Sequence, residues 1–498
     1  MSADGKGSKD VRGTKGMKET VGAGSATGAR GAGGAGDASV DADLGRHRSM
    51  AGLIAYSLPA IAMMVFTSIY GIVDGFFISN FVGKTAFAAV NLILPVAFLL
   101  GSFGFMFGTG GSALIAKTLG EGDERRANGY FTLVVCVAAV VGVIAASLGA
   151  ILMEPIARLL GASDDMLGTA VLYGRMNMIS LPGYVLQYMF QALFMTAGKP
   201  RLGFAVTVLA GVLNMVLDAL FVGVLHWGVV GAAAATNIAE LTGGIVPLVY
   251  FMRRNASLLR LTRPAGGARV ILKVAGNGSS EMVSSVATAV VSMVYNLQLM
   301  SLIGEDGVSA YGVIMYTWMV FSAVFLGYDT ATAPLMSYSY GARDVREMQS
   351  LFRKGLAFMV GGGVLMLVLS HVLARPLSAL FVGYDEGLLN LTTHAYRIYS
   401  FAYLLTGFNV FGSSLFTALN NGGVSAATSF LRTFVFEVGA VLLLPMLIGA
   451  DGVWASIIVA EVAAAVLNAV LIVWLAPQYG YLRRGARKAG RAAGAPRS

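Results

Sequence analysis

Cysteine, histidine and charged residues are scarce in this sequence, and each scarcity excludes a class of protein. The single cysteine, Cys136, cannot form an intramolecular disulfide. Four histidines without ligand spacing give no basis for a metal site, and no phosphate-binding loop of the G-x-x-x-x-G-K-[ST] type supports ATP-driven work. Acids, histidines and nucleophiles do not cluster as a lipid-modifying enzyme would require, so we expect no enzymatic activity and no cofactor.

Hydrophobic residues are abundant instead. They make up 56% of the 498 residues, whereas charged residues make up only 12%. One soluble core cannot bury so much apolar surface, so the composition indicates a polytopic membrane protein. A helix needs about 20 apolar residues to cross roughly 30 Å of hydrocarbon. Twelve segments are therefore predicted as transmembrane helices: 51–78, 88–116, 130–153, 168–196, 202–225, 229–252, 275–301, 309–338, 355–374, 391–418, 425–448 and 452–475.

Lysine and arginine are unevenly distributed between these segments. They concentrate in four loops on the side of the N-terminus and in the C-terminal tail, whereas the opposite side carries only Lys84, Arg158 and Arg375. Because basic loops stay in the cytoplasm, we predict a multi-pass plasma-membrane protein with both termini cytoplasmic. The net charge of +9 is then explained by contact with anionic lipid headgroups, and we expect no nucleic-acid partner.

The same pattern divides the chain into five parts. Residues 1–48 are rich in Gly, Ala and Ser and are predicted to be a disordered cytoplasmic tail. Residues 49–252 form the first six-helix bundle, and residues 253–274 form a basic cytoplasmic linker. Residues 275–478 form the second six-helix bundle, followed by a basic cytoplasmic tail at 479–498.

The two halves are related by an internal repeat. A shift of 221 positions superposes identical residues: Gly83 on Gly304, Ala89 on Ala310, Thr109 on Thr330, Gly120 on Gly341, Asp123 on Asp344, Arg125 on Arg346 and Glu240 on Glu461. Six helices are an even number, so both halves have the same orientation in the membrane. The fold is therefore predicted as all-α, with two six-helix bundles related by a pseudo-two-fold axis along the membrane normal.

Several stretches also resemble a known family. "IYGIVDGFFISNFVGKTAFAAVNLILP", "GTGGSALIAKTLGEGDERRAN", "LNMVLDALFV" and "WGVVGAAAATNIAE" are similar to the first, second, fifth and sixth helices of multidrug and toxic compound extrusion (MATE) transporters. The resemblance extends over residues 50–480. It implies an antiporter that exports cationic amphipathic compounds in exchange for protons or sodium ions by alternating access.

The resemblance also implies a cation-coupling site in the first bundle. Family members use an aspartate on helix 1, an asparagine and an aspartate on helix 5, and a threonine on helix 6. The matching residues here are Asp74, Asn214, Asp218 and Thr236. The coupling ion would be a proton or a sodium ion, and no other metal is expected.

The residues themselves support this site. Asn214 and Asp218 lie four positions apart and therefore share one face of an apolar helix. The predicted topology places Asp74 and Thr236 at a similar depth, in the outer half of the membrane, with no lysine or arginine near them. A carboxylate there costs several kcal/mol unless it is protonated, paired or coordinated. The alternative is that Asn214 and Asp218 only hydrogen-bond between helices.

The second half has no copy of this cluster. The same shift places Asp74 on Tyr295, and it places apolar residues or glycine opposite Asp218 and Thr236. We therefore expect ion coupling to reside in the first bundle only.

Other membrane-embedded acids are less informative. Glu281, Asp329 and Glu437 are candidates for contact with a cationic substrate or for a gate, although each could instead be solvated or paired with an arginine. Glu240 and Glu461 occupy equivalent positions, so symmetry favours a shared structural role for them.

A second transport function stays open at this stage. Related folds of the wider superfamily move lipid-linked sugars across the bilayer, so a flippase is the alternative. In either case the partners are a small molecule and the lipid bilayer, and we expect the protein to act as a monomer.

Overall fold

The computed structural model describes residues 44–82 and 84–482. Within these residues all regular secondary structure is helical. The helices of the first half are α2 (Met50–Phe81), α3 (Lys84–Gly120), α4 (Glu124–Leu159), α5 (Asp164–Thr196), α6 (Pro200–Asp218), η1 (Ala219–Val224) and α7 (Gly228–Met252). Those of the second half are α8 (Gly267–Leu302), α9 (Glu305–Gly341), α10 (Val345–Val382), α11 (Glu386–Tyr399), η2 (Ser400–Ala402), α12 (Tyr403–Ala418), α13 (Gly422–Phe430), η3 (Leu431–Glu437), α14 (Val438–Ile448) and α15 (Ala450–Tyr479).

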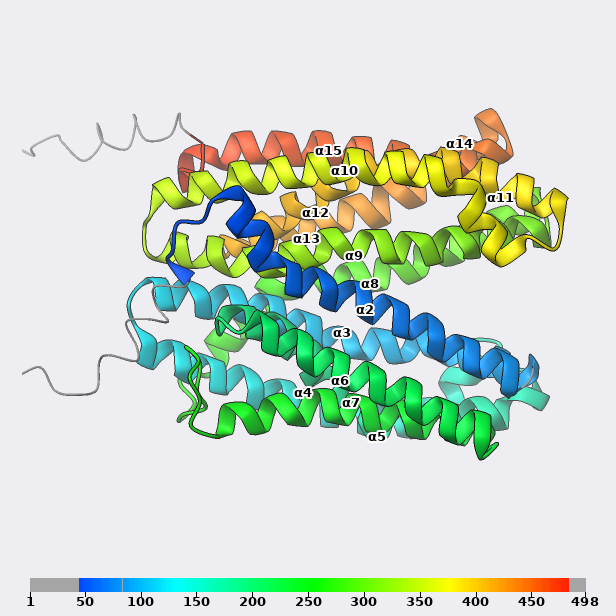
Figure 1. The fold of residues 1–498 in the computed structure, drawn as a ribbon, viewed down its shortest axis with the longest axis horizontal. Coiled ribbons are helices and arrows are strands. Elements are labelled where there is room, and N and C mark those ends of the chain that lie inside the picture. The colour runs from blue at the N-terminus through cyan, green and yellow to red at the C-terminus, as the bar shows by residue number, and fades with distance from the viewer. Residues whose placement is uncertain (1–43, 83, 483–498) are drawn as a thin grey trace, which may run out of the picture.

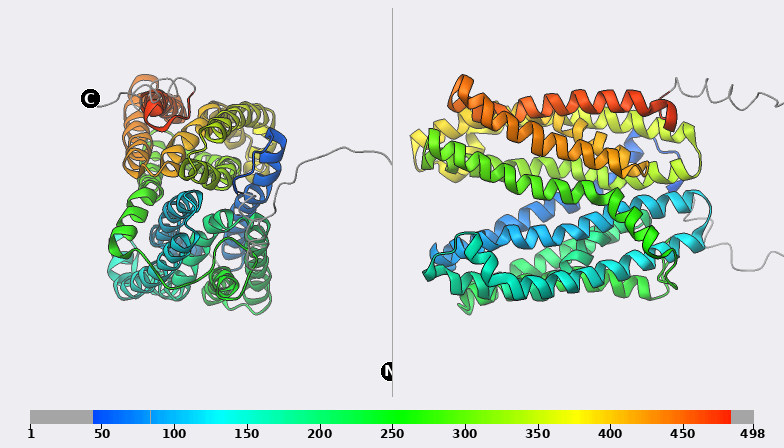
Figure 2. Two further views of the ribbon diagram at one scale, coloured as in Figure 1. Left: turned by 90° about the vertical axis from the view of Figure 1, so that its left-hand side faces the viewer. Right: turned by 180° about the vertical axis from the view of Figure 1, so that it is seen from behind.

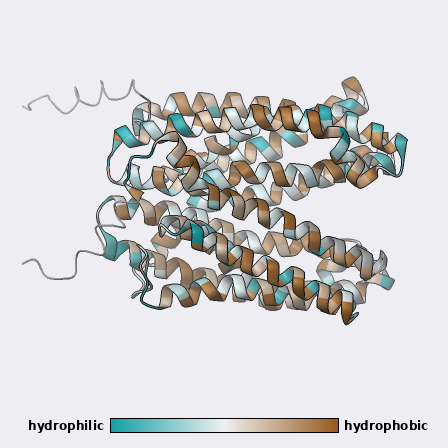
Figure 3. Ribbon diagram, viewed as in Figure 1, coloured by the Kyte–Doolittle hydropathy of each residue, from teal (hydrophilic) through white to brown (hydrophobic). Residues whose placement is uncertain are grey.

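These helices form the two predicted bundles. Figure 1 shows α2 to α7 in the lower bundle and α8 to α15 in the upper one. Figure 3 shows hydrophobic residues along the length of the helices, with hydrophilic residues more frequent towards their ends. Residues 1–43 and 483–498, most of the two predicted tails, lie outside the described residues.

Within the described residues, eleven helical spans are long and apolar enough to cross a membrane. The remaining predicted span, 168–196, corresponds to α5, which is a continuous helix of 33 residues. Its interior positions include the buried polar residues Asn177, Ser180, Gln187 and Gln191. These polar side chains lower its hydropathy because α5 is enclosed by other helices and does not need an apolar surface on every side.

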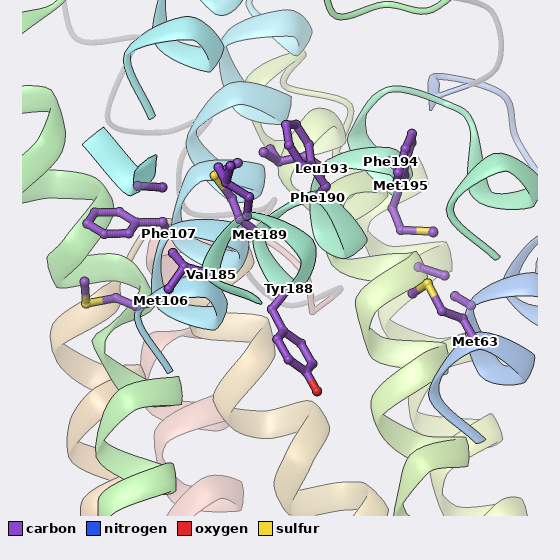
Figure 4. Close-up of a cluster of buried hydrophobic side chains, with 14 of the residues drawn as sticks. Met63, Met106, Phe107, Val185, Tyr188, Met189, Phe190, Leu193, Phe194 and Met195 are labelled. Carbon is purple, nitrogen blue, oxygen red and sulfur yellow. The ribbon is translucent and has the colours of Figure 1, made fainter. Parts of the chain in front are cut away.

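The core of the first bundle is built around α5. Figure 4 shows methionine and aromatic side chains of α5 beside Met63 of α2 and Met106 and Phe107 of α3. Met189 and Phe190 are fully buried there. This dense packing fixes the positions of α2 and α3, which also form the boundary to the second bundle.

The predicted repeat is visible in how the helices begin. Asp123 caps α4 by accepting a hydrogen bond from the Arg126 amide at 2.9 Å, and Asp344 caps α10 by accepting one from the Glu347 amide at 3.0 Å. These two caps are 221 positions apart in the sequence, so equivalent aspartates start equivalent helices.

The bundles also meet through a symmetric pair of glycines. A Cβ atom on Gly120, the last residue of α3, would lie 2.1 Å from the carbonyl oxygen of Tyr338 in α9. A Cβ atom on Gly341, the last residue of α9, would lie 2.0 Å from the carbonyl oxygen of Lys117 in α3. The two contacts are related by the shift of 221 positions, which demonstrates the approximate two-fold symmetry.

Further close crossings lie nearer the middle of the same helices. Gly278 of α8 packs against the main chain of α3, where an added Cβ would lie 1.9 Å from the Met106 carbonyl oxygen. Gly327 of α9 packs against α2, where an added Cβ would lie 2.4 Å from the Ile61 Cα atom. In Figure 2 the bundles converge towards the end at which α2 begins and α15 ends, which we call the terminal end.

The segment before α2 is part of this closed end. His47 hydrogen-bonds Glu347 of α10, and Lys354 of α10 donates a hydrogen bond to the Arg48 carbonyl oxygen. Leu44 is only 2% exposed. Residues 44–48, within the stretch predicted as a tail, are therefore packed against the helices, and α10 supplies the polar partners of His47 and Arg48.

Candidate functional site

A cavity inside the first bundle brings together side chains from four helices. Its lining residues are Tyr70, Gly71 and Asp74 of α2, Gln187 of α5, Ala210 and Asn214 of α6, and Thr236, Ala239 and Glu240 of α7. The space that water-sized molecules can occupy in the cavity is about 50 Å³, room for a cation with a few water molecules. Three of the four residues predicted for cation coupling thus line one space.

The fourth residue, Asp218, lies one helical turn beyond Asn214 and is fully buried. It ends the regular part of α6, and the chain continues as a π-helical segment from Ala219 to Val224. Asp218 and Asp74 are close enough to interact electrostatically, so the two carboxyl groups form a pair. A π-helical turn widens the helix and is frequent beside functional sites.

The oxygen atoms of this cluster lack hydrogen-bond partners, as other buried polar atoms of the protein do, but here several such atoms are grouped around one cavity. Asp74 Oδ1, Asn214 Oδ1, both carboxyl oxygens of Asp218 and Thr236 Oγ1 are buried without a hydrogen bond. Buried polar atoms in folded proteins almost always have a partner. Several oxygens without partners in one buried region are therefore consistent with a ligand that supplies positive charge or hydrogen-bond donors.

No cationic side chain from α2, α6 or α7 lies near enough in sequence to neutralise the carboxyl groups of Asp74 and Asp218. The sequences of α2 and α7 contain no lysine or arginine, and α6 has only Arg201 in its first turn. Arg175 of α5 is exposed and donates to the Ala150 carbonyl oxygen at 3.2 Å. The site can thus be neutralised by a proton or by a hard monovalent cation, for which carboxylate, amide and hydroxyl oxygens are suitable ligands.

The sequence did not place three polar lining residues in the cavity: Tyr70 and Gln187 were not singled out, and Glu240 was expected to have a structural role only. Glu240 follows Thr236 by four positions and therefore shares its face of α7. That spacing is a signal that could have identified Glu240. Tyr70 precedes Asp74 by four positions on α2 in the same way, whereas Gln187 has no such signal because its helix carries no predicted site residue.

The candidate substrate or gate residues lie in the second bundle, where Asp329 and Glu281 are close enough to interact electrostatically and Glu437 lies apart from them. Asp329 lines a second, smaller cavity in the second bundle, with Thr332, Met336, Phe411 and Ser414 among its neighbours. Thr332 and Met336 belong to α9, Phe411 and Ser414 belong to α12, and Leu351 of α10 also lines the cavity, which therefore lies between these three helices.

Glu281 and Glu437 are both partly buried. Glu281 follows the close crossing at Gly278 by three residues, so it lies beside the boundary between the bundles. Glu437 ends the π-helical segment η3. Arg432, the arginine nearest to it in sequence, forms its ion pair with Glu461 instead, at 2.5 Å.

Comparison with known proteins gives consistent matches along the chain. A protein-family model described as MatE matches residues 59–220 and again 282–442, once in each bundle. The multidrug export protein MepA of Staphylococcus saprophyticus subsp. saprophyticus is 24% identical over 427 residues, which is 85% of this chain and 93% of that protein.

Solved structures share the fold. The crystal structure of a MATE protein in complex with MaL6 has a TM-score of 0.83 at 21% identity, covering 89% of this chain and 99% of that one. The outward-facing conformation of a multidrug resistance MATE family transporter of the MOP superfamily has a TM-score of 0.80 at 23% identity, covering 89% and 99%. Both likenesses extend over the two bundles.

Proposed function

Because the chain belongs to the MatE family of membrane transporters, we propose that it is a secondary antiporter exporting organic compounds, mainly cationic amphipaths, in exchange for protons or sodium ions. As a member of that family it is a multi-pass membrane transporter and not an enzyme. In this proposal it acts as a monomer in the plasma membrane with both termini cytoplasmic. It needs no cofactor besides the coupling ion.

One observation carries the proposal: the orphaned oxygen atoms of Asp74, Asn214, Asp218 and Thr236. Four side chains from three helices present these atoms within one buried region that has no cation of its own. The carboxyl groups of Asp74 and Asp218 can hydrogen-bond to each other only if they share a proton, and Asn214 Oδ1 and Thr236 Oγ1 have no partner in the protein. A bound proton or sodium ion would satisfy them.

The coupling follows from the cost of buried charge. With the site empty, two carboxylates face each other in an apolar bundle, and this is tolerable only while water can enter the cavity. With a cation bound, the cluster is close to neutral and can be enclosed. The loaded and empty sites thus favour different conformations, which is the requirement for ion-driven exchange.

Alternating access requires the path between the bundles to be closed at one end, and the symmetric glycine contacts close it in this conformation. Gly120 and Gly341 hold the bundles together at the terminal end, with Gly278 and Gly327 nearer the middle of the helices, and we place the terminal end in the cytoplasm. In this conformation the substrate path would open outward. Export requires these contacts to separate so that the path opens to the inside.

The name of the Staphylococcus relative supports a drug-like substrate. MepA is named a multidrug export protein, and we extend that activity to this chain. Asp329, Glu281 and Glu437 are acids of the second bundle that would attract a cationic substrate or form part of its gate.

A flippase for lipid-linked sugars is less well supported by the same contacts. Such a substrate carries anionic phosphate and requires free cationic side chains in its path. Arg432 is largely buried in the second bundle, but Glu461 already neutralises it. Arg375 is also paired, with Glu386 at 2.9 Å.

The experiment uses purified protein in liposomes with ethidium as the fluorescent substrate. A proton gradient and a sodium gradient are imposed separately, and wild type is compared with Asp218→Asn and Asp74→Asn. We expect one gradient to drive ethidium transport in wild type and both variants to lose that response while still binding ethidium.

Glu154→Gln is the matched control. It makes the same acid-to-amide change on the exposed surface of α4, where Glu154 pairs with Arg158 at 3.1 Å. It should transport like wild type. Transport that ignores both gradients in wild type, or that survives in the two aspartate variants, contradicts the antiporter proposal.

A further inference from the structure

Two glutamates at equivalent positions of the repeat have opposite surroundings. Glu240 of α7 and Glu461 of α15 are 221 positions apart. Glu461 is 1% exposed, pairs with Arg432 at 2.5 Å, and accepts a hydrogen bond from the side-chain amide of Asn409. Glu240 instead lines the cavity of the first bundle and accepts a hydrogen bond from the Ser180 hydroxyl at 2.6 Å.

The absence of an ion pair at Glu240 has a simple cause. The residue equivalent to Arg432 in the first bundle is Gly211. Gly211 packs tightly, since a Cβ atom there would lie 2.5 Å from the Phe66 ring and 3.0 Å from the Tyr70 ring. The first bundle thus has an aromatic contact where the second has a cation, and Glu240 keeps an uncompensated carboxyl group.

The charged and titratable groups around Glu240 carry no positive charge. Those that interact with it are Tyr70 and Asp74 of α2, and Tyr173, Tyr184 and Tyr188 of α5. From α6 the nearest acid is Asp218, which belongs to the same cluster as Asp74. One buried region of the first bundle therefore holds three carboxyl groups, those of Asp74, Asp218 and Glu240.

One monovalent ion cannot neutralise three carboxylates. If a proton or sodium ion binds at Asp74 and Asp218, a second positive charge is still required before the cavity can be enclosed at low cost. Glu240 lies one helical turn from Thr236, about 6 Å along α7 towards the terminal end. It is therefore at the inner end of the cavity, separate from the pair of aspartates.

The hydrogen bonds around Glu240 accommodate a proton on its carboxyl group. Ser180 Oγ lies 2.6 Å from Glu240 Oε2 and 2.7 Å from Asn237 Oδ1, but a hydroxyl group has one hydrogen to donate. When Glu240 is ionised, Ser180 donates to it, and the 2.7 Å contact between Ser180 Oγ and Asn237 Oδ1 is left without a hydrogen. When Glu240 is protonated, it donates to Ser180 Oγ, and Ser180 turns its hydrogen to Asn237. Glu461, by contrast, forms an ion pair with Arg432.

We infer that Glu240 is a second proton-carrying residue of the first bundle, binding one proton and releasing it once per transport cycle. This inference rests on the proposed antiport. The proton enters from water in the cavity, forms an O–H bond on the Glu240 carboxylate, and returns to water on the other side. Together with the ion at Asp74 and Asp218, two monovalent cations are exchanged for each substrate molecule.

The test counts protons directly with tetraphenylphosphonium as a monovalent probe. Purified protein in weakly buffered detergent is mixed with the probe, and released protons are counted with a pH indicator. Glu240→Gln should release one proton fewer than wild type, because Gln fits the same space and can still accept from Ser180. Glu240→Asp, which retains a carboxyl group, should recover the wild-type number.

A second readout uses liposomes. Exchange of two cations for one monovalent substrate moves net charge, so wild-type transport should respond to a membrane potential set with potassium and valinomycin. Glu240→Gln should exchange one for one and lose this response while still following the chemical gradient. If Glu240→Gln loses transport altogether, the number of protons released in detergent decides whether Glu240 carries a proton.

The outcomes separate the two proposals. An unchanged number of released protons in Glu240→Gln, or an unchanged response to membrane potential, overturns the inference while the antiport stands. A wild-type protein that follows no ion gradient overturns the antiport and the inference with it. Glu154→Gln serves again as the surface control and should match wild type in both measurements.

Discussion

Gly120 and Gly341 each pack against the main chain of the other's helix, at the ends of α3 and α9. The opposing atoms are backbone carbonyl oxygens at 2.1 and 2.0 Å from the ideal Cβ positions, so a side chain cannot be accommodated by rotamer changes. The closest approach of the two bundles therefore depends on the absence of two Cβ atoms.

Substitution of Gly120 tests this contact. Gly120→Ala should destabilise the closed conformation by about 1 to 3 kcal/mol, the usual cost of overpacking, and should lower the transport rate. The loss of stability is measured by thermal unfolding in detergent. Gly361→Ala is the control, because an added Cβ there meets no atom within 4 Å. Equal unfolding temperatures for Gly120→Ala and wild type would contradict the assignment of Gly120 to a tight contact.

Ligand-dependent stability tests the cation site independently of transport. A cation that binds only the folded protein raises its unfolding temperature by mass action. We expect sodium ions, or a decrease of pH from 8 to 6, to raise the unfolding temperature of wild type. Asp218→Asn should lose most of that increase, since both orphaned oxygens of Asp218 belong to the site. An increase of equal size in wild type and variant would place the ion elsewhere.

The ion pair of the second bundle should be structural. Arg432→Gln leaves Glu461 buried without its cation, which typically costs about 3 to 5 kcal/mol. Removing both charges in Arg432→Gln with Glu461→Gln should restore much of that loss. Thermal unfolding of the two variants measures both effects. Glu240→Gln, at the equivalent position of the first bundle, should unfold close to wild type because it breaks no ion pair.

The segment before α2 should depend on Lys354. This side chain donates to the Arg48 carbonyl oxygen and to Ser350 Oγ. Lys354→Met should release the segment and allow trypsin to cut after Arg48, which mass spectrometry detects. Arg353→Met is the neighbouring control, since Arg353 is exposed and bonds only within α10. Equal protection of Arg48 in all three proteins would show that Lys354 does not hold the segment.

Much of the architecture could be read from the sequence because helix formation in a membrane is a local property. The lengths of the apolar segments predicted the spans, and the shift of 221 positions predicted the symmetry now seen at Gly120 and Gly341. Helix ends were less accurate: α8 begins at Gly267, eight residues before the predicted span, because amphipathic turns extend helices beyond hydrocarbon. The span 425–448 is a chain of α13, η3 and α14 rather than one regular helix.

The site was predictable in part, for a similar reason. Asn214 and Asp218 are one turn apart on a single helix, so their common face follows from sequence spacing alone. The contribution of Gln187 was not predictable, because it depends on how α5 packs against α2 and α7. The packing of α5 against those helices leaves no periodic pattern in the sequence.

The sequence by itself determined the class of protein, the two bundles and a shared position for Glu240 and Glu461. It could not determine that these two glutamates have different surroundings. Only the tertiary structure decided this, since Arg432 reaches across from η3 to Glu461, whereas the aromatic rings around Gly211 occupy the equivalent space beside Glu240. Whether a segment spans the membrane depends on the apolar residues of that segment alone. Whether a buried charge is neutralised depends on which side chains the different helices bring within a few ångströms of it.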